Sequence, residues 1–112
     1  MKVSRPLLTL VFALLGSTAA LAEGDEIRIG QTLPYSGPAS GFGIIGRAQE
    51  AYFEKVNAEG GINGRKIKFI SLDDAYSPPK TVEQTRKLVE QEEVLLMFGS
   101  LGTATNNAVH RY

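Results

Sequence analysis

The chain has 112 residues, 43% of which are hydrophobic, and its twelve basic residues are balanced by twelve acidic ones. The basic residues are interspersed with acids along the chain, which argues against a nucleic-acid-binding protein. There is no cysteine, and this excludes disulfides as well as a lipid-modified cysteine.

Residues 1–22 have the pattern of a secretory signal peptide. Lys2 and Arg5 precede a short apolar stretch, and small residues lead up to Ala22. The stretch is too short to span a bilayer comfortably, so we favour a cleaved signal over an uncleaved membrane anchor, with cleavage between Ala22 and Glu23. The mature product would keep ten basic and twelve acidic residues, would carry a net charge of about −2 and should be soluble.

A strand and an amphipathic helix are predicted first in the mature chain. The strand covers 26–33, and the proline-containing segment 34–38 ends it. The helix covers 43–58, because apolar residues recur there at steps of three and four and so lie on one face. This predicted core face consists of Ile45, Ala48, Tyr52 and Val56.

A helix end, a tight turn and a second strand follow in immediate succession. Gly60 and Gly61 can adopt the left-handed conformation that closes a helix, and Asn63-Gly64 supplies a turn. The second strand covers 66–72. Two prolines then suit the first turn of a second helix, whose predicted core face consists of Val82, Thr85, Leu88 and Val89.

The third strand is expected over 94–98, where a continuous apolar run is typical of a central strand covered on both faces. Gly99 to Gly102 then turn the chain into a last helix. The order β-α-β-α-β-α with short connections predicts an α/β fold with a parallel sheet. If the strand order is 2-1-3, the loops after strands one and three diverge and leave a crevice for a ligand.

Three motifs at consistent spacing give a family resemblance. They are SGPASGFG at 36–43, NAEGGINGRKIKFISLDD at 57–74 and DDAYSPPK at 73–80. Together they resemble the periplasmic binding proteins of branched-chain amino acid ABC transporters, over about residues 26–112. The resemblance implies a two-lobed type I periplasmic binding fold, of which 23–112 would be the truncated N-terminal part of lobe one. It also implies a monomeric periplasmic receptor without a cofactor, which delivers an amino acid or similar small carboxylate to an ABC permease.

The resemblance also implies ligand contacts in two segments. Phe42 stands where relatives commonly place an aromatic residue that faces the solute. The turn with Leu101, Gly102 and Thr103 corresponds to one that holds the α-carboxylate of an amino acid through a hydroxyl and backbone amides. A helix start also favours anions, and the Thr103 hydroxyl could add a hydrogen bond. The alternative is that Thr103 merely caps the helix.

The segment 41–46 matches the GxGxxG pattern of dinucleotide-binding folds. In those folds the glycines turn directly off the strand, whereas here residues 32–40 intervene with two prolines. A flexible glycine-rich loop at a helix start is therefore favoured over a nucleotide site.

Asp73 and Asp74 could serve acid–base or metal chemistry. Neighbouring strand residues point in opposite directions, however, and no histidine or cysteine lies nearby to complete a metal shell. We therefore favour a structural role in loop fixing and helix capping. His110 is expected at the surface, and Tyr35, Tyr52 and Tyr76 are expected to be packing or rim residues.

These observations predict a binding protein rather than an enzyme, with no catalytic residue and no metal site. The favoured function is the solute receptor of an ABC importer for branched-chain or related amino acids, incomplete in this chain. The alternatives are the ligand-binding portion of a sensory receptor, a nonfunctional truncated remnant and, less favoured, a nucleotide-dependent enzyme. Because one incomplete lobe lacks every second-lobe contact, we expect this chain alone to bind weakly or not at all.

Overall fold

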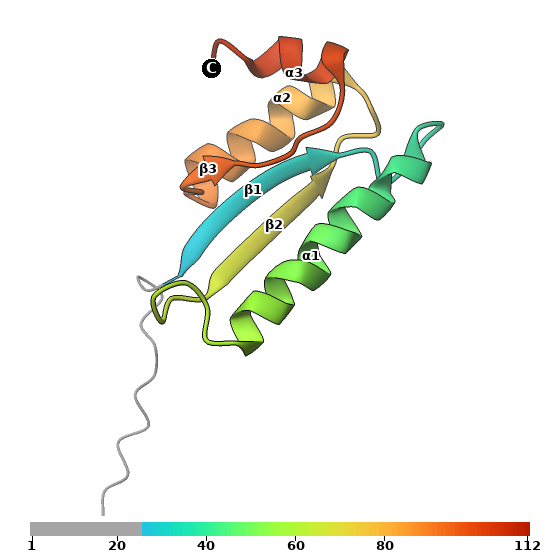
Figure 1. The fold of residues 1–112 in the computed structure, drawn as a ribbon. Coiled ribbons are helices and arrows are strands. Elements are labelled where there is room, and N and C mark those ends of the chain that lie inside the picture. The colour runs from blue at the N-terminus through green and yellow to red at the C-terminus, as the bar shows by residue number, and fades with distance from the viewer. Residues whose placement is uncertain (1–25) are drawn as a thin grey trace, which may run out of the picture.

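The computed structural model describes residues 26–112 and shows a three-stranded parallel sheet (Figure 1). β1 (Ile27–Leu33) lies in the middle, between β2 (Ile67–Asp73) and β3 (Leu96–Met97). The predicted order 2-1-3 is therefore confirmed. The predicted signal peptide lies outside the described residues. Within 26–112, no helix combines the length and the apolar character that a bilayer span requires.

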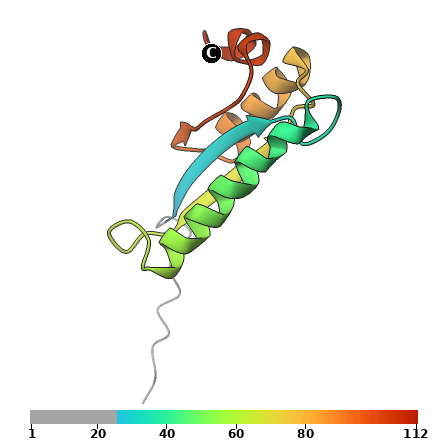
Figure 2. The same cartoon turned by 45° about the vertical axis from the view of Figure 1, so that its right-hand side comes forward.

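The helices cover both faces of the sheet. α1 (Gly43–Ala58) lies on one face, and α2 (Pro78–Arg86) and α3 (Thr103–Val109) lie on the other (Figures 1 and 2). A short 3-10 helix, η2 (Ser40–Phe42), leads into α1, and α2 continues into one turn of π-helix, η3 (Lys87–Gln91). This arrangement follows from the topology, because the crossover from β1 to β2 and the crossover from β2 to β3 run in opposite directions across the sheet, and right-handed crossovers then place their helices on opposite faces.

The packed face of α1 differs from the predicted one. Gly43 and Gly46 are its buried residues, whereas Tyr52 is 63% exposed and Ile45 is 37% exposed. The prediction of Ile45, Ala48 and Tyr52 as core residues is therefore wrong, and only Val56 of that set is half-buried. The hydrophobic period missed this face because glycines form part of it, and glycines allow the helix to approach the sheet closely.

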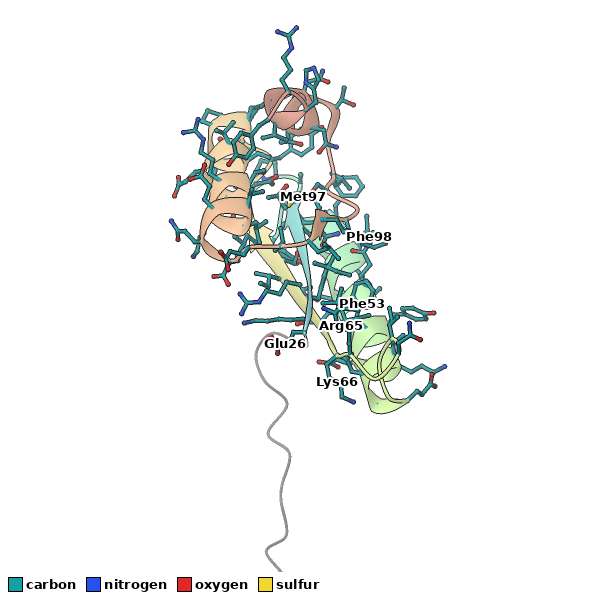
Figure 3. All side chains as sticks on the ribbon, turned by 90° about the vertical axis from the view of Figure 1, so that its left-hand side faces the viewer. Glu26, Phe53, Arg65, Lys66, Met97 and Phe98 are labelled. Carbon is teal, nitrogen blue, oxygen red and sulfur yellow. The ribbon has the colours of Figure 1, made fainter. Side chains whose placement is uncertain are left out.

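An aromatic cluster completes the contact between α1 and the sheet. The Phe53 ring of α1 lies 5.1 Å from the Phe69 ring of β2 and 5.9 Å from the Phe98 ring, centroid to centroid. Figure 3 shows Phe53 and Phe98 on facing elements. Tilted and edge-on ring pairs at these separations are favourable beyond the area that they bury.

The third strand is shorter and more exposed than predicted. Only Leu96 and Met97 pair with β1, at the edge of the sheet, and the prediction of a five-residue central strand over 94–98 is wrong. Leu95 is 71% exposed. A continuous apolar run is typical of a strand inside a sheet that is covered on both faces. Here β3 is an edge strand, and among residues 26–112 no further strand pairs with its outer edge.

The core of α2 is more polar than predicted. Thr85 and Leu88 are buried as expected, together with Thr81, whereas Val89 is exposed and Val82 is half-buried. The two prolines occupy the first turn, as predicted. Apolar spacing could not locate this face, because the threonines that form part of it are read as polar.

The turn between α1 and β2 forms as predicted, with φ of +74° at Gly61, +50° at Asn63 and +78° at Gly64. The sequence did not predict how α1 is fastened to β2. The Asn57 side chain donates to the Ile67 carbonyl and accepts from the Ile67 amide, both at 2.7 Å. This pair of bonds fixes the start of β2 against the end of α1.

Candidate functional site

Three loops lie at the carboxyl edge of the sheet, because parallel strands all end on the same side. The first loop (34–42) follows β1, the second loop (74–77) follows β2 and the third loop (99–102) follows β3. Figure 1 shows the ends of β1 and β2 and the start of α3 at one end of the molecule. This is the edge at which the topology predicts a crevice.

Asp73 fastens the first loop to the end of β2. Its Oδ1 accepts from the amides of Tyr35 at 2.8 Å, Ser36 at 3.1 Å and Ala75 at 3.0 Å. Its Oδ2 accepts from the Ser36 hydroxyl at 2.6 Å and from Lys80 Nζ at 3.0 Å. Partial burial alone would favour the neutral carboxyl, but these hydrogen bonds outweigh it and hold the pKa of Asp73 well below its usual range.

Asp74 fastens the second loop to α2. Its Oδ1 accepts from the Tyr76 amide at 2.9 Å, and its Oδ2 accepts from the Thr81 hydroxyl at 3.0 Å. Both carboxylates also bond to side chains of α2, Asp73 to Lys80 and Asp74 to Thr81. The expected loop fixing is therefore confirmed, whereas the expected helix capping is wrong, because the cap position of α2 is Ser77 and makes no side-chain hydrogen bond. Among residues 26–112, no group of three or more metal-ligating side chains is present.

The third loop is anchored on the central strand and on α3. The Ser100 hydroxyl accepts from the Thr32 amide at 3.1 Å, and the Leu101 amide donates to the Thr32 carbonyl at 3.4 Å. The Thr105 hydroxyl donates to the Leu101 carbonyl at 2.7 Å. The loop is thus held from both of its ends.

Thr103 is the first residue of α3 and does not cap it. Gly102 occupies the cap position with φ of +115°, and the cap makes no side-chain hydrogen bond, so the alternative that Thr103 caps the helix is wrong. Thr103 is exposed, and its hydroxyl makes no hydrogen bond within residues 26–112. α3 has seven residues, so any anion binding here rests on the hydroxyl and the nearby amides more than on the helix dipole.

Phe42 and Tyr76 border the same edge from the other two loops. Phe42 ends η2 and is 53% exposed. Tyr76 was expected to be a packing or rim residue, and its ring packs directly against the third loop, because a Cβ on Gly102 would lie 2.7 Å from its Cε2 atom. Tyr76 also has a positive φ of 58°, a signal that no sequence pattern carries. The remaining predicted residues, Leu101 and Gly102, are half-buried.

Two of the three glycines of the GxGxxG match, Gly43 and Gly46, allow α1 to pack closely. A Cβ on Gly43 would lie 2.8 Å from Tyr35 Cδ1, and a Cβ on Gly46 would overlap the Tyr35 hydroxyl. A Cβ on Gly41 would meet nothing within 4 Å. The pattern is thus explained by the close approach of α1 to Tyr35, without a phosphate.

The other candidates, Tyr35, Tyr52 and His110, have packing or surface positions. Tyr35 is half-buried and bonds to Ser71, which agrees with a packing role, whereas Tyr52 is exposed on α1. His110 is exposed and its Nδ1 lies 2.8 Å from the Asn107 carbonyl, as expected for a surface residue.

Comparison with known proteins gives one consistent picture. A family model described as periplasmic binding protein matches residues 26–112. An amino acid binding protein of Pseudomonas aeruginosa is 40% identical over 86 residues, which are 74% of this chain and 22% of that protein. A Leu/Ile/Val-binding protein homolog 7 of Brucella abortus is 33% identical over 102 residues, which are 90% of this chain and 25% of that protein.

Solved structures agree with these relatives. The branched-chain amino acid transporter substrate binding protein LivJ of Streptococcus pneumoniae, in complex with isoleucine, gives a TM-score of 0.69 at 25% identity, over 74% of this chain and 24% of that one. A solute binding protein of an ABC transporter from R. palustris, in complex with benzoate, gives 0.61 at 31% identity, over 77% of this chain and 24% of that one. The chain therefore spans about a quarter of the length of the proteins it matches.

Proposed function

Because this chain belongs to the periplasmic binding protein family, we propose that it forms part of the ligand-binding lobe of a receptor for an ABC importer. The family consists of substrate-binding proteins of transporters and not of enzymes. The proposed ligands are branched-chain or related amino acids, or another small carboxylate. The observation that supports this most is the exposed, unbonded Thr103 hydroxyl at the edge where three loops meet.

The proposed ligand contacts come from two loops. Thr103 would donate its hydroxyl hydrogen to a carboxylate oxygen, and the Gly102 amide would assist it. Leu101 would line the turn without donating, because its amide already bonds to the Thr32 carbonyl, and the exposed Phe42 ring would form an apolar wall. A hydrogen bond to a charged group is stronger than one between neutral groups, so this contact would contribute much of the affinity.

The ligands of two solved relatives support the carboxylate class. Isoleucine and benzoate are bound in those proteins, and the two molecules share a carboxylate but differ in everything else. A turn that reads the shared group would suit both, and the distinguishing contacts would then come from elsewhere in a complete receptor. We therefore assign the carboxylate to the third loop and leave the rest of the ligand to other segments.

The cellular setting belongs to the same proposal. Residues 1–22 would be removed on export, between Ala22 and Glu23, and the complete receptor would act as a monomer in the periplasm and deliver its ligand to a membrane permease. Ligand contacts made only between closed lobes would shift the receptor from its open to its closed form.

A chimera tests the role of Thr103. Residues 26–112 replace the matching segment of the Pseudomonas aeruginosa amino acid binding protein, and amino acid binding is measured by calorimetry. We expect Thr103→Ala to weaken binding roughly 10- to 100-fold, the value of one hydrogen bond to a charged group, and Thr103→Ser to restore it. Asn107→Ala, at an exposed position of the same helix, is the control. Full affinity in the Thr103→Ala chimera would remove the proposed contact.

A further inference from the structure

A buried hydrogen-bond network crosses the sheet beneath the candidate site, on the face that α1 covers. Its centre is Gln31 of β1, whose exposed fraction is 0%. Gln31 Nε2 donates to Gln49 Oε1 at 2.6 Å, to the Phe98 carbonyl at 3.1 Å and to the Gly99 carbonyl at 3.0 Å. The Ser71 hydroxyl donates to Gln31 Oε1 at 2.8 Å. One side chain thus contacts the helix and both neighbouring strands or their ends.

The network continues to the first loop with a fixed direction. Main-chain carbonyls only accept, so the amino group of Gln31 must face Phe98 and Gly99, and its oxygen must face Ser71. The Ser71 hydroxyl donates its one hydrogen to Gln31 Oε1. In the hydrogen bond between Tyr35 and Ser71, whose oxygens lie 2.5 Å apart, the Tyr35 hydroxyl is therefore the donor. An unbroken series of donors and acceptors therefore runs from Tyr35 to the start of the third loop.

A buried polar side chain at position 31 costs free energy of folding. Ile29 and Leu33, two residues away on either side, lie on the same face of β1 and are buried and apolar. Burying an amide costs free energy unless each of its groups is bonded, so an apolar residue would serve packing alone at least as well. The third loop is also adapted to this glutamine. Gly99 has a φ of +66°, and a Cβ there would lie 3.2 Å from Gln31 Nε2.

We propose that Gln31 is a positioning residue, which sets the separation between the first loop, with Tyr35, and the third loop, with Gly99. Its role in ligand binding rests on the proposed function, but its coupling of the two loops does not. Phe42 and Thr103 flank these loops, so a change in their separation would alter the space offered to a ligand.

Nuclear magnetic resonance on the purified chain tests the coupling without any ligand. Tyr35→Phe removes one hydroxyl at one end of the network. We expect it to shift the side-chain amide resonance of Gln31 and the backbone resonances of Gly99 and Ser100. In a Gln31→Met background, the same Tyr35→Phe substitution should leave Gly99 and Ser100 unchanged. A residue that contributes only to stability would not transmit the effect in this way.

Amide exchange gives a second readout. Gln31→Met should raise the exchange rate of the Leu101 amide by about tenfold relative to amides inside β1 and β2, which is the equivalent of one lost hydrogen bond. Leu88→Ala, on the opposite face of the sheet, is the control, because it lowers global stability and should raise all of these rates together. If Gln31→Met does not fold, Ser71→Ala breaks the same network one bond earlier and takes its place.

The outcomes separate this inference from the proposed function. Shifts that stop at Ser71 after Tyr35→Phe, or shifts at Gly99 that persist in the Gln31→Met or Ser71→Ala background, would overturn the coupling even if the chimera binds its ligand. Coupling without any binding by the chimera would leave the positioning role in place and refute the receptor proposal.

Discussion

Asp73 accepts hydrogen bonds from the first loop, the second loop and Lys80, and all of these donors favour its ionised form. Because the folded-state pKa lies below the unfolded value of about 3.9, the ionised carboxylate stabilises the fold fully above that pH. The stabilisation is lost as the pH falls below about 4, towards the folded-state pKa.

Asp73→Asn should therefore act in two ways. The free energy of unfolding at neutral pH should fall by about 1–3 kcal/mol, since an amide nitrogen replaces one of the oxygens that accept from Ser36 and Lys80. The loss of stability between about pH 4 and pH 2 should become shallower, because one linked proton is removed. Urea unfolding at several pH values measures both effects, with Glu83→Gln at an exposed position as the control. An unchanged acid slope would contradict this account of Asp73.

Gly46 and Gly41 separate packing from phosphate binding within one motif. Gly46→Ala should lower the free energy of unfolding by about 1–3 kcal/mol, because its Cβ would overlap the Tyr35 hydroxyl and lie 2.8 Å from Leu33 Cδ1. Gly41→Ala should change it by less than about 0.5 kcal/mol, because the space around it is open. Thermal unfolding of the two variants measures the difference. Equal melting temperatures would show that α1 does not depend on this close approach.

At the scale of elements, connection lengths and turn residues carried the prediction. Short strand–helix–strand connections and the glycines at 60, 61 and 64 gave the parallel sheet, and the order 2-1-3 followed from the common arrangement for that connectivity. The spacing of apolar residues failed to predict the buried helix faces where small or polar residues pack against the sheet. Gly46 and Gln49 of α1, and Thr81 and Thr85 of α2, face the interior, and a pattern search reads them as neutral or polar.

The site was predictable only in part for a related physical reason. The loops could be located from the sequence because parallel strands end on one side; Phe42 ends the first loop, and Thr103 directly follows the third. Tyr76 was expected only as a packing or rim residue, and Gln31 was missed, since their positions depend on contacts between segments that lie far apart in the sequence. A buried glutamine between apolar neighbours is the one signal that could have drawn attention to Gln31.

Asn57 gives a test at this scale, because it joins two elements through one side chain. Asn57→Ala would leave the amide and the carbonyl of Ile67 without these partners, and we expect the free energy of unfolding to fall by about 1–3 kcal/mol. Asn107→Ala, on the exposed side of α3, should have little effect. Chemical unfolding followed by circular dichroism compares the two. Equal midpoints would mean that the contact between α1 and β2 does not need this clamp.

For the whole molecule, the outer edge of β3 is the feature with the clearest consequence. It offers unpaired main-chain groups next to the exposed side chains of Leu95, Leu96 and Phe98. An apolar groove lies on each side of this edge, one lined by Tyr52, Phe53 and Phe98 and the other by Val89, Met97 and Val109 among others. An open strand edge with apolar neighbours is a template for pairing with another chain.

We therefore expect the purified chain to self-associate through this edge as its concentration rises. Leu95→Lys should shift the association to a higher concentration, because a charge at an exposed edge position opposes edge-to-edge pairing. Ile44→Lys is the matched control, since Ile44 is 62% exposed but lies on α1 and lines neither groove. Light scattering over a concentration series measures the average mass of each variant. A chain that stays monomeric at every concentration, or an equal effect of both substitutions, would show that the β3 edge is not the contact.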